Sequence, residues 1–421
     1  MFKFLHAADI HLDSPLQKLQ QYEGAPVEEL RQATRRAFEN LIELAVSEGV
    51  DFVLIVGDLY DGDWKDYNTG LYFVSRIAKL RDAGIPVYIV TGNHDAANTM
   101  TKTLRLPEGV YLFPIDEPGT FRLPALGIAI HGQGFATKAV KKDLSVGYPA
   151  PVSEYYNIGV LHTCATGREG HEPYAPCSIA TLESKGYDYW ALGHVHQREI
   201  LSTEPLIVFP GNIQGRHIRE TGPKGCMLVA VDEKGSTHAH FHPLDVIRWV
   251  RCQVDTGFTE DADEAVDAIS LALTELLEKS EGFPLVVRVE IKGRLQVHEE
   301  LSGDLERWTN EIRSAAIDLS GGRIWIEKVT LDTASPSPTE VPGFVDGPMG
   351  EILHCLDEIS KDEDQLQSLG EVLNDLFKKL PRELKDGPEA ITPDSNEWLS
   401  GLLGQVRYML LRRLTAKGNG R

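Results

Sequence analysis

Five short polar clusters, each directly following a strand-like apolar run, occur in one order along the first half of this chain. The apolar runs cover residues 2–8, 52–56, 87–90, 158–161 and 189–192. Strands of an open α/β sheet deliver their carboxyl ends to one crevice, so we expect the five clusters to converge. They are Asp9-Ile-His11, Gly57-Asp58-Leu-Tyr-Asp61, Gly92-Asn93-His94-Asp95, His162 and Gly193-His194-Val-His196.

The side chains of these clusters suit a pair of divalent metal ions. Two ions about 3.5–4 Å apart need a carboxylate that can bridge them. Mixed imidazole, carboxylate and amide donors suit Mn²⁺, Fe²⁺ or Zn²⁺ better than an all-oxygen magnesium site or a thiolate zinc site. We assign Asp9, His11 and His196 to one ion and Asn93, His162 and His194 to the other. Asp58 is assigned to both ions as the bridging carboxylate.

A structural explanation competes with the metal hypothesis for each motif taken singly. An isolated D-x-H or H-x-H is more often a turn or a surface pair than a functional site. Five clusters at strand ends are harder to explain as packing, because burial of unpaired imidazoles and carboxylates is unfavourable. Their joint occurrence therefore predicts a dinuclear metal site.

The series D-x-H, G-D-x-x-D, G-N-H-D, H and G-H-x-H resembles the calcineurin-type metallophosphoesterase superfamily. Within it, the stretches Leu5–Leu16 and Pro210–His217 are similar to the SbcD-type DNA double-strand-break repair exonucleases, and more closely to their YhaO-type relatives. The resemblance covers residues 1–245 by motif and the remainder by layout only.

The resemblance implies the same seven metal ligands as the strand-end argument. It also implies that His94 stabilises the reacting phosphate or protonates the leaving oxygen, with Asp95 in support. Some relatives carry a second histidine three positions after the bridging aspartate, where this chain has Asp61. For Asp61 we expect hydrogen bonding from behind the metal ligands rather than acid catalysis.

Other polar residues near the motifs have two interpretations each. Arg216 and His217 follow a Pro-Gly turn and are candidates for contacting substrate phosphate, which suits guanidinium and imidazole groups; a structural role is equally open. His131 follows an apolar run, and we expect it to be a satisfied structural histidine. The alternating His238, His240 and His242 predict a solvated strand face.

The pattern of elements predicts an α/β fold, a two-layer β-sandwich core flanked by helices over residues 1–245. A small α+β domain should follow over 246–333, similar in layout to the cap domain of SbcD-type proteins, although a structural or dimer-bracing role is as well supported. Residues 334–348 are rich in Pro, Ser and Gly and predict a linker before a helical tail, 349–421. In the α+β domain we expect strands at 251–255, 285–291 and 324–330, and helices at 262–279 and 301–316.

The tail carries three apolar stripes at helical spacing, the third running from Leu399 to Leu414. In the SbcD family a comparable tail docks on the coiled-coil root of an SMC-like ATPase, so the resemblance implies a YhaN/SbcC-type ATPase partner. A self-contained three-helix bundle is the competing explanation, and a homodimer is left open.

Composition limits the setting. The formal charge of −21 predicts weak autonomous affinity for DNA, because nucleic-acid binders usually carry a basic footprint. No apolar run is long enough to cross a bilayer. The five cysteines are odd in number and form no C-x-x-C pair, which argues against a disulfide framework. We expect a cytoplasmic protein without membrane partners.

The sequence as a whole predicts a two-metal phosphodiesterase acting on DNA, a Mn²⁺-dependent exonuclease or endonuclease subunit that works in DNA repair with an ATPase. One alternative is a small-molecule phosphodiesterase or phosphatase with the same core, which the acidic charge favours. Another is a largely structural subunit of an ATPase complex, which the complete ligand set argues against.

Overall fold

The structure is a computed structural model of the chain. It describes residues 1–14, 27–61, 67–96, 106–165, 175–256, 259, 261–294, 298–334, 348–380, 395–396, 398–403 and 406. Within these ranges, none of the helices has the length and apolar character that a bilayer crossing requires. The chain divides into two compact units, Met1–Thr333 and Ala334–Arg421, and the first contains all five polar clusters.

One six-stranded sheet has the strand order β12-β11-β1-β2-β3-β4. Strands β1 to β4 run parallel, β11 pairs antiparallel with β1, and β12 pairs antiparallel with β11. Their bounds are β1 Phe2–Ala8, β2 Phe52–Val56, β3 Val87–Val90, β4 Val110–Leu112, β11 Gly225–Val231 and β12 Thr237–Pro243.

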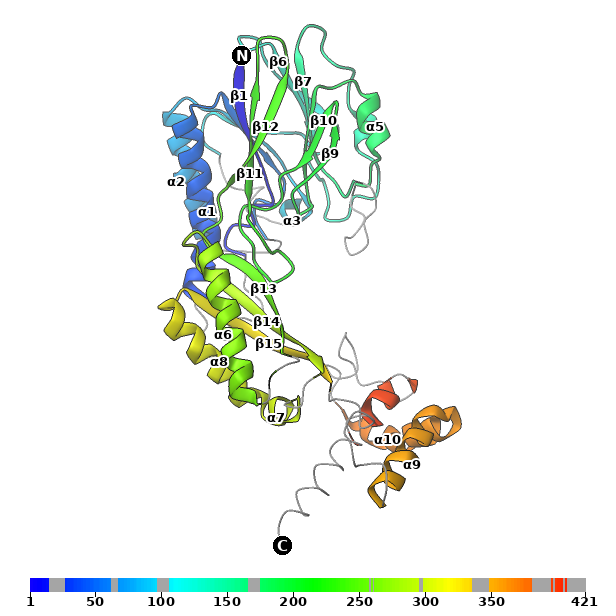
Figure 1. Ribbon diagram of the computed structural model, residues 1–421. Helices are drawn as coiled ribbons and strands as arrows, with labels where there is room; N and C mark the ends of the chain where they lie inside the picture. Colours follow the sequence, from blue (N-terminus) through cyan, green and yellow to red (C-terminus); the bar gives the residue numbers. More distant parts are fainter. Residues whose placement is uncertain are drawn as a thin grey trace. The chain divides into compact units, whose positions relative to one another are not determined.

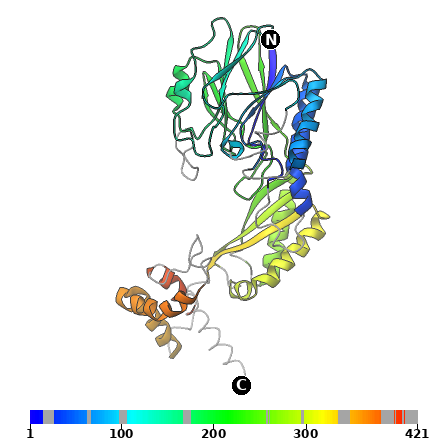
Figure 2. The ribbon, with the colours of Figure 1, turned by 180° about the vertical axis from the view of Figure 1, so that it is seen from behind.

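Two helices cover the outer face of this sheet. Helix α1 (Val27–Glu48) connects β1 to β2, and α2 (Tyr67–Asp82) connects β2 to β3. They lie side by side on one side of the core (Figures 1 and 2). Their apolar stripes bury Phe38, Leu41 and Phe73 against the sheet, which explains why the periodic pattern of the sequence forms helices here.

The second six-stranded sheet has the order β5-β6-β7-β8-β10-β9. Its central strands β6, β7, β8 and β10 are parallel, with β5 and β9 antiparallel at the two edges. The short helix α5 (Ile179–Ser184) lies on its outer side, opposite α1 and α2 (Figure 1). The strands are β5 Gly119–Leu123, β6 Ile128–Gln133, β7 Tyr156–His162, β8 Tyr189–Gly193, β9 Glu199–Thr203 and β10 Leu206–Phe209.

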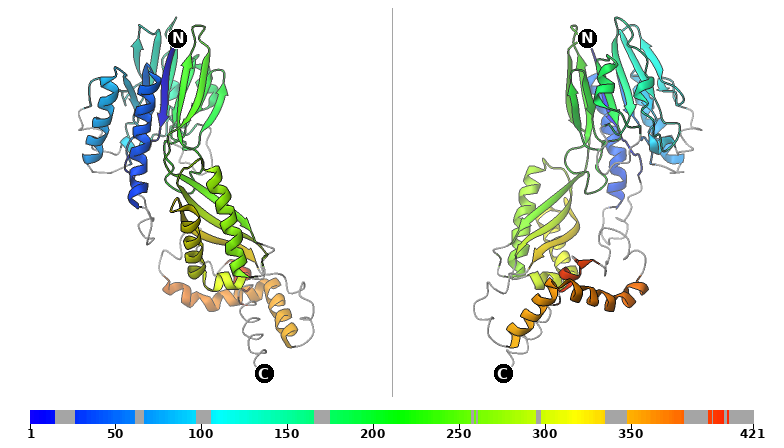
Figure 3. Two further views of the ribbon diagram at one scale, coloured as in Figure 1. Left: turned by 60° about the vertical axis from the view of Figure 1, so that its left-hand side comes forward. Right: turned by 90° about the vertical axis from the view of Figure 1, so that its right-hand side faces the viewer.

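The two sheets pack face to face around a common apolar core. Phe4 and Phe52 of the first sheet stack with ring centroids 4.9 Å apart, and Tyr189 of the second sheet meets Phe4 edge-on at 5.3 Å. The side views of Figure 3 show α1 and α2 outside this sandwich. The predicted two-layer α/β core flanked by helices is confirmed.

A three-stranded module follows the sandwich in the first unit. Its strands are β13 (Arg248–Asp255), β14 (Leu285–Arg294) and β15 (Ile324–Ala334). Helix α6 (Ala262–Lys279) packs beside α8 (Leu305–Ser320), and both helices bury apolar side chains in the core of the module. The single helix expected at 301–316 is wrong in one respect: two helices, α7 (His298–Gly303) and α8 (Leu305–Ser320), occur there. Asp304 separates them, because its non-helical backbone and carboxylate cap Arg307 N at 3.2 Å.

The second unit contains helices α9 (Pro348–Lys361) and α10 (Glu363–Lys379). Leu366 of α10 shares a small core with Leu399 and Leu403 of the following segment. The expected linker falls almost wholly on 335–347, and the end of the third apolar stripe on 407–414, both outside the described residues.

Candidate metal centre

The loops that follow β1, β2, β3, β7 and β8 meet at one edge of the sandwich. Backbone hydrogen bonds join the first two loops, with His11 N donating to Asp58 O and Leu12 N to Leu59 O, both at 2.9 Å. Among the described residues, ligand atoms lie within 4.8 Å of one another in three groups. The first is the set assigned to one ion, and the second combines the bridge Asp58 with two histidines assigned to the other ion. The groups are Asp9, His11 and His196; Asp58, His162 and His194; and His11, Asp61 and His94.

The first group brings two imidazoles together. His11 Nε2 lies 3.2 Å from His196 Nε2, and Asp9 Oδ1 lies 4.0 Å from the same His196 atom. Asp9 is fixed by His194 N, which donates to both carboxylate oxygens at 3.0 and 3.2 Å. Three potential donors to a metal thus face a common point.

The second group shows most directly that a cation fits. His162 Nδ1 lies 3.2 Å from Val56 O, while Nε2 lies 3.0 Å from Asn93 Oδ1 and 3.5 Å from Asp58 Oδ2. A neutral imidazole has one N–H group, so the His162 ring can donate a hydrogen bond from only one of its two nitrogens. With Nδ1 donating to Val56 O, the bare Nε2 faces two acceptor oxygens, an arrangement that a divalent ion resolves.

Asp58 lies between the two groups. Its Oδ2 is 3.5 Å from His162 Nε2 and 3.8 Å from His11 Nε2, and its Oδ1 accepts from His94 N at 2.9 Å. One carboxylate oxygen therefore faces a ligand of each group.

Burial of the ionised carboxylates at this edge of the sandwich is electrostatically unfavourable for the protein alone. Burial, and then the Asp58 charge, raise the pKa of Asp9 well above its ordinary value, and burial likewise raises the pKa of Asp58. Burial lowers the pKa of His162 to about 3, so its ring is neutral near pH 7. Buried carboxylates beside neutral imidazoles form an acceptor-rich site that a cation stabilises.

The backbone is strained at the ligands. Asp9, His11, Asp58 and His194 have positive φ angles of 50°, 46°, 49° and 101°. Non-glycine residues seldom adopt this region, and such residues concentrate at functional sites. The sharp turns they make explain how each strand ends at a ligand.

The motif glycines leave space that no side chain can occupy. A Cβ on Gly57 would lie 2.1 Å from His162 Nδ1, and one on Gly92 would lie 2.3 Å from Asp58 Oδ1. A Cβ on Gly193 would lie 1.9 Å from Val56 O. Each glycine therefore permits close approach of a neighbouring strand or ligand.

His94 lies at the start of the short helix α3 (Asn93–Ala96), beside the two ligand groups. Its Nδ1 is 2.8 Å from Asp61 Oδ1. Burial lowers the pKa of His94, but the hydrogen bond to Asp61 and the charge of Asp58 outweigh it and raise the pKa above its ordinary value. Burial acts to raise the pKa of Asp61, yet the His11 and His94 rings hold it below the ordinary value. Asp61 thus orients His94.

Asp95 is buried and faces the backbone. Its carboxylate accepts from Gly92 N and Tyr60 N at 3.0 Å and from Leu59 N at 3.2 Å. These bonds tie the loop after β2 to the turn after β3. Asp95 therefore supports the site by holding the chain segments that carry Asp58 and His94.

Arg216 lies at the edge of the site, whereas His217 is largely exposed. Arg216 Nη1 is 3.2 Å from Ser14 Oγ and 3.6 Å from Asp61 Oδ2. The His217 side chain is 54% exposed, with Nε2 3.3 Å from Glu220. The two candidate substrate contacts therefore differ: Arg216 joins the network around Asp61, and His217 lies outside it.

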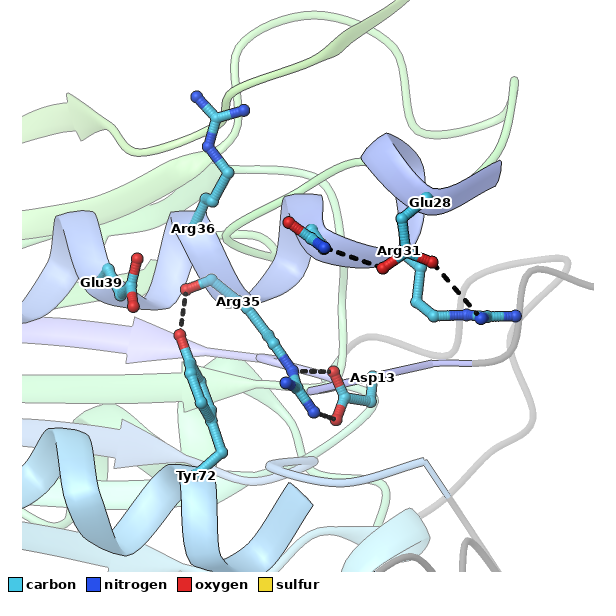
Figure 4. A pocket seen from close by; sticks show the side chains of 8 residues that line it. Asp13, Glu28, Arg31, Arg35, Arg36, Glu39 and Tyr72 are labelled. Carbon is cyan, nitrogen blue, oxygen red and sulfur yellow. Dashed lines mark hydrogen bonds and ion pairs between the residues drawn. The ribbon is translucent and has the colours of Figure 1, made fainter. Parts of the chain in front are cut away.

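Sequence reasoning missed the residues that hold the ligand loops from outside. Asp13 accepts from Arg35 Nε and Nη2 at 2.6 and 2.5 Å and from Thr69 Oγ1 at 2.6 Å, which ties the Asp9–His11 turn to α1 and α2. Figure 4 shows the Asp13–Arg35 ion pair at a cavity of about 610 Å³. The lining of this cavity has three arginines and three carboxylates but none of the seven predicted ligands, so we assign it a supporting role. The lining residues are Asp13, Glu28, Arg31, Gln32, Arg35, Arg36, Glu39 and Tyr72.

His131 and the three alternating histidines of β12 behave as structural or surface residues. His131 is buried, with Nδ1 2.8 Å from Thr120 Oγ1 and Nε2 3.0 Å from Asn157 Oδ1. His238, His240 and His242 are exposed along β12. Neither set contributes to the three donor groups.

The chain matches two protein-family models and resembles several known proteins. Residues 2–198 match the calcineurin-like phosphoesterase family, and residues 249–334 match the middle domain of metallophosphoesterase YhaO. The chain is 34% identical over 294 residues to the uncharacterized metallophosphoesterase YhaO of Bacillus subtilis (strain 168), covering 69% of this chain and 71% of that protein. It is 23% identical over 338 residues to the DNA double-strand break repair protein Mre11 of Thermoplasma acidophilum, covering 74% and 82%. A dimetal phosphatase from Danio rerio aligns with 55% of this chain and 93% of its own, at 13% identity and a TM-score of 0.36.

The fold and the donor clusters define a metal-dependent phosphoesterase. The chain belongs to the calcineurin-like metallophosphoesterase family and carries a YhaO-type middle domain. The family resemblance drawn from the motifs is confirmed, as is the expectation of divalent metal binding.

Replacing Gly92 by alanine should disrupt the metal centre although the substitution adds only a methyl group and no polar atom. The new Cβ displaces Asp58 or His162, and a displacement of about 1 Å costs on the order of 100-fold in rate. Calorimetric titration with Mn²⁺ and hydrolysis of bis-p-nitrophenyl phosphate measure the effect. Gly147→Ala is the matched control, because its Cβ would meet Pro118 only at an ordinary 3.5 Å. Equal metal affinity in the two variants would contradict the close-approach argument.

Replacing Asp58 by asparagine should separate folding from metal binding. In EDTA the melting temperature should equal or exceed that of the wild type, because a buried charge is removed while an oxygen that can accept from His94 N is kept. Mn²⁺ at about 100 times its Kd stabilises the folded wild type by about 2.7 kcal/mol and so raises its melting temperature. Asp58→Asn should show no such increase in melting temperature. The control Asp232→Asn, at the exposed turn after β11, should keep it; an unchanged Mn²⁺ response in Asp58→Asn would refute the bridge.

Proposed function

We propose that this chain is a two-metal, Mn²⁺-dependent phosphodiesterase that hydrolyses DNA as the nuclease subunit of a DNA-repair complex. The observation that carries the proposal is the position of Asp58 Oδ2, 3.8 Å from His11 Nε2 and 3.5 Å from His162 Nε2. A carboxylate shared by two donor sets is the arrangement that two-metal hydrolysis of phosphodiesters requires.

The chain's own residues provide orientation and proton transfer. When bound, the two divalent ions polarise the phosphodiester and activate the attacking water. Asp61 accepts from His94 Nδ1 at 2.8 Å, which leaves Nε2 as the atom that can meet substrate. From that atom His94 stabilises the reacting phosphate or protonates the leaving oxygen. Arg216, anchored beside Asp61, is placed to contact a non-reacting phosphate oxygen.

Support for a DNA substrate comes from the relatives. The Mre11 proteins are DNA double-strand break repair proteins by name, and the match to one of them covers 74% of this chain, more than the phosphoesterase core. The YhaO-type middle domain is a second argument, because an enzyme for small substrates has little need of it.

Because the chain is acidic, we propose that a partner protein helps it to bind DNA. With a formal charge of −21, the chain is expected to hold DNA weakly by itself. We propose that an SMC-like ATPase of the YhaN/SbcC type supplies the basic surface and docks on the C-terminal helices. In support, Val372 of α10 is 78% exposed and Ile352 of α9 is 39% exposed, although both helices are amphipathic. A homodimer is an alternative use of the same helices.

The test is hydrolysis by the purified full-length chain with Mn²⁺, using linear double-stranded DNA, single-stranded DNA and bis-p-nitrophenyl phosphate, with Asp58→Ala as the blank. Metal-dependent DNA cleavage that the variant lacks is the expected result. Absence of cleavage both alone and with the co-purified ATPase would overturn the nuclease proposal.

A small-molecule phosphodiesterase is the second candidate, favoured by the net charge. It predicts turnover of small diesters, such as a cyclic nucleotide, with no DNA cleavage under any condition. A largely structural subunit predicts neither activity, but the complete set of buried donors argues against it.

His94→Ala should lose hydrolysis by about 100- to 10,000-fold, the usual contribution of a positioned general acid. Mn²⁺ affinity should stay at the wild-type value, since His94 is not assigned as a ligand. Steady-state rates on bis-p-nitrophenyl phosphate and calorimetry provide the two readouts, and His238→Ala on the exposed face of β12 is the control. Full activity in His94→Ala would exclude the acid role, whereas loss of metal would make His94 a ligand.

A further inference from the structure

The carboxylate of Glu220 lies directly behind the ligand His196. Glu220 is 4% exposed, and its Oε1 is 2.6 Å from His196 Nδ1. Its Oε2 accepts from Arg216 N at 2.7 Å and from Asn212 Nδ2 at 2.9 Å. A carboxylate surrounded by such donors acts as an acceptor, so His196 Nδ1 carries the proton. The bare Nε2 then points toward His11 and Asp9.

The main chain of His196 is held as firmly as its ring. Lys224, also 4% exposed, donates from Nζ to His196 O at 2.8 Å. Gly211 has a φ of +82°, and a Cβ there would lie 2.9 Å from the same carbonyl oxygen. The segment 211–224 therefore contacts both the ring and the main chain of His196.

The same segment is bonded to the start of the middle module. Trp249 Nε1 donates to Gly215 O at 2.9 Å. Gln214 donates from Nε2 to Ile247 O at 2.7 Å, and its Oε1 accepts from Val246 N at 2.9 Å. These contacts fix the segment from outside, so Glu220 is presented to His196 by a rigid support.

A purely structural role for Glu220 explains less. Its contacts with Arg216 and Asn212 would suffice to anchor the loop, yet its shortest contact is to the ring of a metal ligand. Carboxylates placed behind ligand histidines fix the tautomer and the ring orientation and raise the basicity of the ligand.

We propose that Glu220 is a positioning residue of the metal centre: it fixes His196 as the Nδ1–H tautomer and so sets the affinity for the ion bound by Asp9, His11 and His196. This inference rests on the metal site of the proposed function, but the tautomer is a property of the metal-free protein.

The isosteric variant Glu220→Gln provides a sharp test. Asn212 and Arg216 N donate to Oε2 at 2.9 and 2.7 Å, contacts shorter than the 3.4 Å from Arg216 Nη2 to Oε1. The amide oxygen therefore takes the Oε2 position, and the new NH₂ group faces His196 Nδ1. His196 then adopts the Nε2–H tautomer, which blocks the atom that faces the metal. Two-bond ¹H–¹⁵N spectra of the metal-free, ¹⁵N-histidine-labelled full chain, with His196 assigned through His196→Gln, report the tautomer. Calorimetry with Mn²⁺ reports the affinity.

The expected result is the Nδ1–H tautomer in the wild type, its loss in Glu220→Gln, and Mn²⁺ affinity lowered about 10- to 100-fold at one of the two sites. The control Glu327→Gln removes a carboxylate that Arg288 contacts at 2.8 Å with both Nε and Nη2, away from the metal centre, and should change neither readout. An Nε2–H tautomer in the wild type overturns the proposal even where the variant does not fold. So does wild-type affinity in Glu220→Gln, or equal weakening in Glu327→Gln. A wild type that binds no Mn²⁺ overturns the proposed function instead, and the spectra still decide the role of Glu220.

Discussion

Acceptor atoms are crowded together at one edge of the sandwich, and the geometry of the metal centre follows from this crowding. His162 Nε2 faces oxygens of Asp58 and Asn93, and His11 Nε2 faces His196 Nε2 at 3.2 Å. These atoms can all offer lone pairs to one point, and a bound cation stabilises that arrangement. The positive φ angles of the ligands and the glycines beside them follow from this packing of polar groups.

Three carboxylates outside the donor groups hold the crowded edge in place. Asp13 ties the first turn to α1 and α2 through Arg35 and Thr69. Asp95 ties the loop after β2 to the turn after β3 through backbone amides. Glu220 holds His196 from the segment that follows β10. Each support comes from a different part of the chain, so the ligand loops are held from several directions at once.

Sequence alone predicted the family, the sandwich and the order of the ligand clusters, because apolar runs followed at once by polar residues mark strand ends. It also predicted α6 with the bounds 262–279. It did not predict the break at Asp304, where one capping side chain outweighs a continuous helical pattern. The individual ligand roles remain predictions, which the geometry accommodates.

Of the three supporting carboxylates, Asp95 was expected from the sequence, whereas Asp13 and Glu220 were beyond sequence reasoning for a physical reason. Glu220 and Lys224 are buried although they lie in a polar loop, and both contact His196, which is more than 20 residues away in the sequence. Asp13 is separated by 56 residues from Thr69, its partner on α2. Local patterns contain no trace of such long-range pairs, whereas a strand followed by D-x-H is visible within ten residues.

The Gly193 contact bears on the shape of the whole sandwich. At the metal edge the backbone of β8 reaches that of β2, so that even a Cβ on Gly193 would lie 1.9 Å from Val56 O. Toward the other end, the rings of Phe4, Phe52 and Tyr189 fill the gap between the sheets. The core is therefore a wedge, wide where aromatic rings lie and closed where glycine lies. Because the wedge closes at the carboxyl ends of the strands, ligands from two separate sheets come within reach of one another.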